Sequence, residues 1–337
     1  MTAALLEPPY ATALKPFGAA LAELAGERAE IVCIGADLTR QTETDLFRDT
    51  FPDRFFNAGM AEANAVGIAG GLARAGYTPF FATFGVFATR RCLDQIAMAV
   101  AYPGLSVKIV GFMPGLSSPG GPSHQAIEDV ALMRALPNMT VVDVADATET
   151  RQAVRAIADA AGPVYLRLKR GEIPVMFGAE HELSLTRAQV LRAGSELVII
   201  SSGMMVAAAL AAAAALRARG IETGVVNVPV IKPLDTATVL AVCRAAGAVI
   251  TAENHSIIGG LGSAVAEVLA DDGLGRRFAR IGIGDEFAEP GSRSYLFSRY
   301  GLSVQAIVDR AWGLLGRPGR APAAEDATAA DGTYAPV

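Results

Sequence analysis

Residues 54–91 read RFFNAGMAEANAVGIAGGLARAGYTPFFATFGVFATRR, and this stretch decides the fold. Arg54 to Asn57 predicts a short buried strand, and the residues from Gly59 to Glu62 turn into a helix. A helix is predicted over Ala61 to Arg74, in which the residues from Ala65 to Ala75 are nearly all small or aliphatic, and Thr78 to Ala82 predicts another buried strand. A strand, a helix and a strand in this order form the unit from which parallel sheets are built.

The same alternation continues on both sides of this stretch. Further strands are predicted at 30–35, 106–111, 139–144 and 163–168, and further helices at 91–101, 125–135 and 147–160. Residues 171–186, GEIPVMFGAEHELSLT, break the pattern with Gly, Pro and charges, which is typical of a linker. Beyond it, strands are predicted at 197–201, 222–228, 248–252 and 278–283, with a last helix from Ser303 to about Leu315.

This order predicts an α/β protein with two consecutive, doubly wound, mainly parallel sheets. The first domain with its linker is expected to span residues 1–185 and the second residues 186–316. Residues 317–337 are rich in Gly, Pro, Ala and Asp and lack periodicity, so a disordered tail is predicted there.

Composition narrows the class of protein. A formal net charge of −5 without a basic run argues against a nucleic acid or an anionic membrane surface as partner. The three cysteines lie in apolar runs without CxxC spacing, which favours buried thiols in a reducing compartment. No secretory signal is visible at the N-terminus. Residues 197–216 are apolar enough to imitate a membrane span, but Ser201, Ser202 and Gly203 interrupt them, so a strand, a turn and a helix are expected. These features indicate a cytoplasmic enzyme subunit.

Glu62 is the single carboxylate in otherwise apolar, Gly- and Ala-rich sequence, near the start of a predicted helix. A buried carboxylate needs either a partner or a proton. The segment resembles the pyrimidine-binding domain of transketolases, in which the glutamate of a GxAE motif hydrogen-bonds N1′ of thiamine diphosphate. The resemblance therefore implies that thiamine diphosphate is the cofactor and that Glu62 activates it.

Two neighbouring segments carry further cofactor candidates. Phe84 and Phe87 follow a strand end, where open α/β sheets commonly bind ligands, although two aromatics three residues apart could also be core. In the resemblance this TF..F segment stacks on the aminopyrimidine ring. Asp37, in GADLT after the first strand, could cap a helix. It also matches the aspartate that lies near the cofactor in this family, and the two roles are compatible.

The loop of residues 111–125, GFMPGLSSPGGPSHQ, contains four glycines, three prolines and His124, which is more than a simple connection needs. A lone histidine is more often structural than catalytic. However, GPSHQ resembles the GPTHQ segment of transketolases, which implies that His124 contacts a substrate oxygen or the reacting part of the cofactor. Arg170 ends a strand in LRLKRGEIP and resembles the arginine that binds a donor phosphate, although Lys169 could serve the same need. Glu253 and His255 are expected to be structural or interfacial.

The loop also departs from the transketolase pattern GEDGPTHQ. Gly120 stands where an aspartate reads a donor hydroxyl, and Phe112 falls near an upstream histidine. Because such hydrogen bonds decide selectivity, both positions are candidates for altered substrate binding, and a donor other than the usual pentose phosphate is expected.

The sequence lacks the GDG motif, followed by Asn, with which transketolases bind diphosphate and metal. It also lacks a P-loop, a Rossmann fingerprint and a His/Cys ligand cluster, so no metal site is predicted in this chain. The resemblance covers about residues 10–315 and only the carboxyl-terminal half of a transketolase. It implies an N-terminal partner subunit that binds Mg²⁺ or Ca²⁺, an α2β2 assembly and a sugar phosphate substrate.

Two other functions remain open. The beta subunit of a 2-oxoacid dehydrogenase has similar length, the same two domains and a comparable glutamate, although SHQAIEDV and ALMRALPNMTVV favour transketolase. The chain could also be a non-catalytic assembly subunit whose substrate loop has drifted, which the presence of Glu62, Phe84, Phe87 and His124 together opposes.

Overall fold

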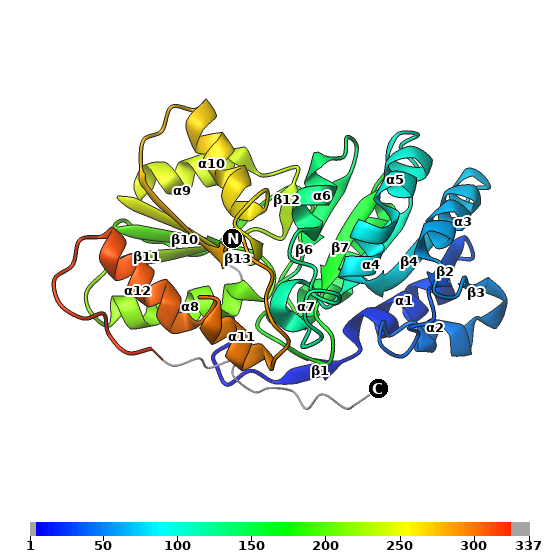
Figure 1. Ribbon diagram of the computed structural model, residues 1–337, viewed down its shortest axis with the longest axis horizontal. Helices are drawn as coiled ribbons and strands as arrows, with labels where there is room; N and C mark the ends of the chain where they lie inside the picture. The colour runs from blue at the N-terminus through cyan, green and yellow to red at the C-terminus, as the bar shows by residue number, and fades with distance from the viewer. Residues whose placement is uncertain (1–4, 325–337) are drawn as a thin grey trace.

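The structure is a computed structural model that describes residues 5–324 and contains two α/β domains lying side by side (Figure 1). The first domain is built on a seven-stranded sheet of order β12-β6-β7-β5-β4-β2-β3. Its strands are β2 (Ile31–Gly35), β3 (Phe55–Asn57), β4 (Thr78–Phe84), β5 (Lys108–Phe112), β6 (Thr140–Asp143), β7 (Val164–Leu168) and β12 (Val230–Lys232). All neighbours pair in parallel except β12 with β6, so the predicted parallel sheet is confirmed.

Strand side chains alternate between two apolar layers, as a sheet covered on both faces requires. Phe80 of β4 packs with Phe17, Leu21 and Val154 of α1 and α7 on one face. Phe81 packs with Ala65 and Ile96 of α3 and η3 on the other. The helices of this domain are α1 (Pro16–Glu27), α2 (Asp45–Thr50), η1 (Pro52–Arg54), α3 (Glu62–Arg74), α4 (Gly85–Thr89), η2 (Arg90–Cys92), α5 (Leu93–Gln95), η3 (Ile96–Ala101), η4 (Gly115–Ser117), α6 (Asp129–Ala135) and α7 (Ala147–Asp159).

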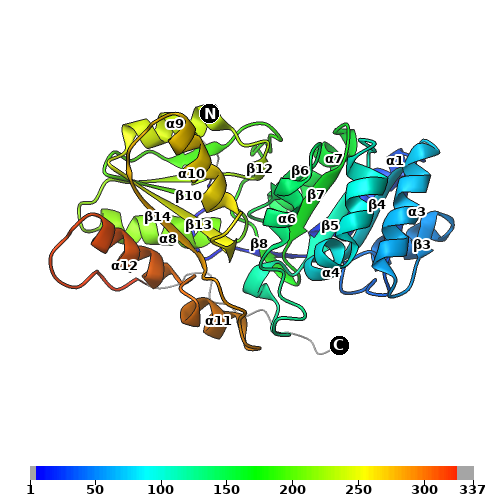
Figure 2. The same cartoon turned by 45° about the horizontal axis from the view of Figure 1, so that its top comes forward.

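The second domain has a five-stranded sheet of order β14-β13-β10-β11-β9. Its strands are β9 (Gln189–Arg192), β10 (Leu197–Ser201), β11 (Thr223–Asn227), β13 (Ala248–Ser256) and β14 (Arg277–Ile283), and only β9 runs antiparallel. Both views place α9 (Thr236–Ala245) and α10 (Leu261–Asp271) on one face and α8 (Met205–Arg217) and α12 (Val304–Leu314) on the other (Figures 1 and 2). A short helix, α11 (Arg293–Arg299), precedes α12. The apolar segment 197–216 is therefore β10 and α8, as expected. Among residues 5–324, no helix is both long and apolar enough to cross a membrane.

Several elements differ from the sequence prediction. β3 is a partly exposed edge strand rather than a buried one, because apolar sequence does not show which strand lies at a sheet edge. The helix predicted at 125–135 starts only at Asp129, since Gln125 is held in the preceding loop by its side-chain bonds to Ser118 O and Glu289 O. Residues 90–101 form a 3₁₀ turn, a short α-helical turn and a π-helix instead of one helix. The linker contributes β8 (Glu172–Pro174), which pairs with β1 (Thr12–Leu14).

The beginning of the predicted tail is ordered against the second domain. Trp312 Nε1 donates to Pro318 O at 3.2 Å, and Ala324 N donates to Gln305 Oε1 at 2.9 Å. Hydrogen bonds of this kind between side chains and backbone cannot be read from composition. Residues 325–337 of that tail lie outside the described residues.

A buried polar network joins the two domains. Arg167 of β7 binds Asp129 at 2.7 Å and Asp143 at 3.1 Å, and it also donates to Asn254 O of β13 at 3.0 Å. Ser202 Oγ, from the second domain, donates to Asp143 at 2.8 Å. Burial acts to raise the pKa of Asp129, but Arg167 outweighs it and the pKa is lowered. Breaking such a network would leave unpaired buried charges, so it fixes how the domains meet.

Candidate functional site

Glu62 is the first residue of α3, directly after the turn that follows β3. Asn57, at the end of β3, accepts hydrogen bonds from the N–H groups of Asp37 (3.2 Å) and Gly59 (3.0 Å), which ties the ends of β2 and β3 together. The Glu62 side chain is only 2% exposed. Arg91 Nη1 donates to both of its oxygens, at 3.0 and 2.9 Å. A buried carboxylate needs either a partner or a proton, and in this structure Glu62 has a partner, Arg91.

An aromatic cluster lies on the other side of Arg91. Phe84, the last residue of β4, and Phe87 of α4 have ring centroids 6.1 Å apart and planes inclined by 23°. The His124 ring meets Phe87 edge-on at 5.4 Å and Phe84 at 6.2 Å. The Arg91 guanidinium lies over the Phe87 ring at 4.2 Å. Glu62, Phe84, Phe87 and His124 are therefore brought together in one chain of contacts.

Arg91 is the member that sequence reasoning missed. The only signal was the pair Arg90-Arg91 directly after an apolar segment. Arg90 turns elsewhere and pairs with Glu128, so the two adjacent arginines serve different carboxylates.

His124 is partly exposed, and its Nδ1 lies 2.9 Å from Ser123 Oγ. Gly120 lies directly against it, because a Cβ at Gly120 would come within 2.9 Å of His124 Cβ and 3.0 Å of Cγ. The second domain supports the loop, since Gly291 N donates to Pro119 O at 3.2 Å. Any larger residue at position 120 must therefore displace the histidine ring.

Asp37 and Arg170 lie at the same edge of the sheet without joining this cluster. Asp37 is exposed, just past β2, with a φ of 63°. It does not cap α2, whose N-cap residue is Thr44. Arg170 is partly exposed and follows β7, which β5 separates from β4. Its neighbour Lys169 donates to Glu172 O at 2.7 Å.

Phe112 corrects the sequence-based assignment. Its side chain has no exposed surface and packs edge-on against Phe17 at 5.6 Å, within the core on the α1 side of the sheet. Phe112 pairs in register with Phe84 and shares its apolar layer, but because it has no exposed surface it is not placed to contact a substrate in this structure.

The residues present fit the pyrimidine end of thiamine diphosphate. An aminopyrimidine presents a flat apolar face and a ring nitrogen that can share a proton, and the cluster offers Phe84 and Phe87 for the face and the Glu62 carboxylate for the nitrogen. The described residues offer this fit only for the pyrimidine end of the cofactor and not for its diphosphate end. Among residues 5–324, no group of three or more His, Cys, Asp or Glu side chains could hold a metal ion.

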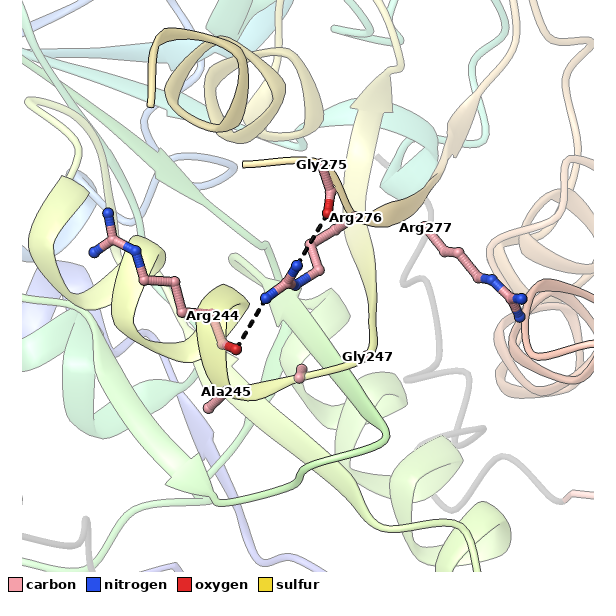
Figure 3. A pocket seen from close by; sticks show the side chains of 7 residues that line it. Arg244, Ala245, Gly247, Gly275, Arg276 and Arg277 are labelled. Atoms are coloured by element: carbon pink, nitrogen blue, oxygen red, sulfur yellow. Dashed lines mark hydrogen bonds between the residues drawn. The ribbon is translucent and has the colours of Figure 1, made fainter. Parts of the chain in front are cut away.

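Two hollows in the protein lie away from this cluster. One, of about 710 Å³, is an open surface hollow before the starts of β13 and β14, lined by Arg244, Arg276 and Arg277 (Figure 3). Arg276 there donates to the carbonyls of Cys243, Arg244 and Gly275. Ligands of open α/β sheets bind at the opposite, carboxyl ends of strands. The other, of about 360 Å³, lies between the domains and includes Lys169, but neither Glu62 nor His124.

Comparison with known proteins places this chain in a family. Residues 11–176 match the pyrimidine-binding domain of transketolase, and residues 186–307 match the transketolase C-terminal domain. The chain belongs to the transketolase family and corresponds to the C-terminal subunit of its split members.

Three related proteins illustrate this membership. A putative uncharacterized transketolase family protein of Sinorhizobium fredii, y4mN, is 46% identical over 87% of this chain and 86% of its own length. The 6-deoxy-6-sulfo-D-fructose transketolase subunit SqwH of Clostridium sp. (strain MSTE9) is 41% identical over 86% of this chain and 89% of its own. A solved structure described as a split gene transketolase, inactive beta4 tetramer, is 43% identical with a TM-score of 0.83, covering 90% of this chain and 97% of the other.

Proposed function

We propose that this chain is the C-terminal subunit of a thiamine diphosphate-dependent transketolase that moves a two-carbon ketol unit from a ketose to an aldehyde. The observation that carries the proposal is the contact chain from Glu62 to Phe84, Phe87 and His124 at the carboxyl edge of the first sheet. Thiamine diphosphate, when bound, supplies the nucleophilic carbon for this reaction.

Each residue of this chain has a distinct part in the proposal. Glu62 exchanges a proton with N1′ of the aminopyrimidine, and its burial excludes competing water. Phe84 and Phe87 form an apolar surface for the ring. His124 holds or transfers a proton at a substrate oxygen, and Arg170 binds the anionic end of the donor. Asp37, at the carboxyl edge of the first sheet, lies near the bound cofactor in this proposal.

The proposed enzyme is complete only with a partner. That partner is an N-terminal subunit of roughly 270 residues, by the usual size of domains, that carries the diphosphate site and its Mg²⁺ or Ca²⁺. We expect an α2β2 assembly in the cytoplasm, where the three free, buried cysteines stay reduced. The related beta4 tetramer described as inactive supports this dependence on a partner.

The donor is proposed to be an anionic ketose that differs from xylulose 5-phosphate near the reacting carbons. Gly120, beside His124, cannot offer the side-chain hydrogen bond that an aspartate gives to a donor hydroxyl. The related subunit named for 6-deoxy-6-sulfo-D-fructose supports a phosphorylated or sulfonated donor, because an arginine fork binds either anion.

The test is an assay of the chain combined with its co-purified partner, thiamine diphosphate and Mg²⁺. We expect ketol transfer from an anionic ketose to an aldehyde, with xylulose 5-phosphate compared against deoxy and sulfonated ketoses. Reduction of an artificial electron acceptor that depends on a 2-oxoacid would instead identify a 2-oxoacid dehydrogenase subunit. Absence of both activities in a complex that binds the cofactor would indicate a non-catalytic assembly subunit.

A further inference from the structure

Arg91 contacts two different side chains at once, Glu62 and Phe87. Its Nη1 bonds both oxygens of Glu62, and its guanidinium covers the Phe87 ring at 4.2 Å. The two partners differ in exposure, because the Glu62 side chain is 2% exposed whereas that of Arg91 is 49% exposed. The carboxylate is therefore held by the fold, and the arginine side chain has solvent into which it can move.

Glu62 and Phe87 are also the side chains that the proposed function assigns to binding of the aminopyrimidine. The cofactor ring must stack on the phenylalanines and reach Glu62 through N1′, so it needs the place that the guanidinium takes. Both Glu62 oxygens are already engaged by a single nitrogen of Arg91. A cation and the cofactor ring cannot use the same side of this carboxylate together.

We propose that Arg91 is a positioning residue that holds Glu62 in the cofactor-free subunit and leaves when the aminopyrimidine takes its place. This inference rests on the proposed function. Arg91 keeps the buried carboxylate paired and aimed while no ligand is present, since an unpaired buried charge would destabilise the subunit. The same pairing competes with the cofactor, because a ligand must first break it.

The chain offers a matched control. Arg90 is the adjacent residue, is similarly exposed and pairs with Glu128 instead of Glu62. The variants Arg91→Met and Arg90→Met remove the same charge from neighbouring positions, and each can be combined with Glu62→Gln.

The first measurement uses the full chain without cofactor or partner. Arg91→Met should lower the urea midpoint of unfolding, and most of this loss should vanish in the Glu62→Gln background. Arg90→Met should have the same effect in both backgrounds. Equal effects of Arg91→Met with and without Glu62 would overturn the pairing and with it the proposal.

The second measurement is a titration of the assembled complex with thiamine diphosphate in the presence of Mg²⁺. Arg91→Met should bind the cofactor at least fivefold more tightly than wild type, whereas Arg90→Met should stay within twofold and Glu62→Gln should bind more weakly. If Arg91→Met bound the cofactor no more tightly than wild type while Glu62→Gln bound it more weakly, the proposed competition between Arg91 and the cofactor would be wrong, but the proposed function of Glu62 would stand. Unchanged binding by Glu62→Gln would instead remove the proposed function of Glu62, and the inference would fall with it.

Discussion

Two buried glutamates in this chain are stabilised in different ways. Glu62 is paired with a cation. Glu253 of β13 instead accepts hydrogen bonds from the N–H groups of Leu261 (2.6 Å) and Gly262 (2.8 Å) at the start of α10. Burial raises the pKa of Glu253 to about 7 although these bonds oppose the shift. Its neighbour His255 accepts from Ala131 N of α6 at 3.3 Å, so it spans the domain junction.

The raised pKa of Glu253 predicts a pH-dependent stability. Because the folded chain holds this proton more tightly than the unfolded chain, its contribution is fully present below about pH 4.5 and is lost as the pH rises to about 7. A shift of this size corresponds to roughly 3 kcal/mol. Glu253→Gln cannot ionise, so its unfolding free energy relative to wild type should rise between pH 5 and pH 8 in denaturant titrations. Glu267→Gln, on the exposed side of α10, should show no such trend; equal slopes for all three proteins would contradict the assignment.

At the scale of elements, α3 carries three glycines whose surroundings differ. A Cβ at Gly70 would come within 2.9 Å of Ala99 O, so this glycine lets η3 pack closely. Gly67 is exposed, with nothing within 4 Å of a Cβ. A glycine in the interior of a helix lowers the stability of that helix, and no contact among the described residues of this chain requires a glycine at position 67. Large apolar side chains are also exposed at Met60, Met98 and Tyr102. Met60 precedes α3, and Met98 and Tyr102 lie in and directly after η3, which contacts α3, so we expect the exposed surface of α3 and η3 to contact the partner subunit.

Alanine substitutions separate these two roles. Gly67→Ala should stabilise the isolated chain by about 1 kcal/mol, the usual difference between the two residues in a helix. Gly70→Ala should destabilise it, because the backbone of η3 would have to shift. Thermal unfolding of both variants tests this pair, and destabilisation by Gly67→Ala would show that the site is not open. In a binding assay with the partner, Gly67→Ala should weaken assembly even though it stabilises the isolated chain.

At the scale of the whole molecule, the sequence predicted the two-sheet architecture because hydrophobic periodicity acts locally. The resemblance to transketolases implied that Glu62, Phe84, Phe87 and His124 belong to one cofactor site, and the structure brings the four residues together through Arg91. The sequence could not place Phe112, because a local pattern does not show that Phe17 of α1 packs over this side chain and buries it completely. Two features depend on tertiary packing, which no local pattern encodes. One is the contact of Arg91 with Glu62, and the other is the pairing of β12, which follows β11 of the second domain in sequence, with β6 in the sheet of the first domain.

The central claim is that this chain holds the pyrimidine half of a thiamine diphosphate site and needs a partner for the other half. The most direct test is calorimetric titration of thiamine diphosphate with Mg²⁺ into the purified chain, and then into the chain mixed with its N-terminal partner. We predict weak or undetectable binding to the chain alone and tight, Mg²⁺-dependent binding to the complex. Tight Mg²⁺-dependent binding by the chain alone would contradict the account.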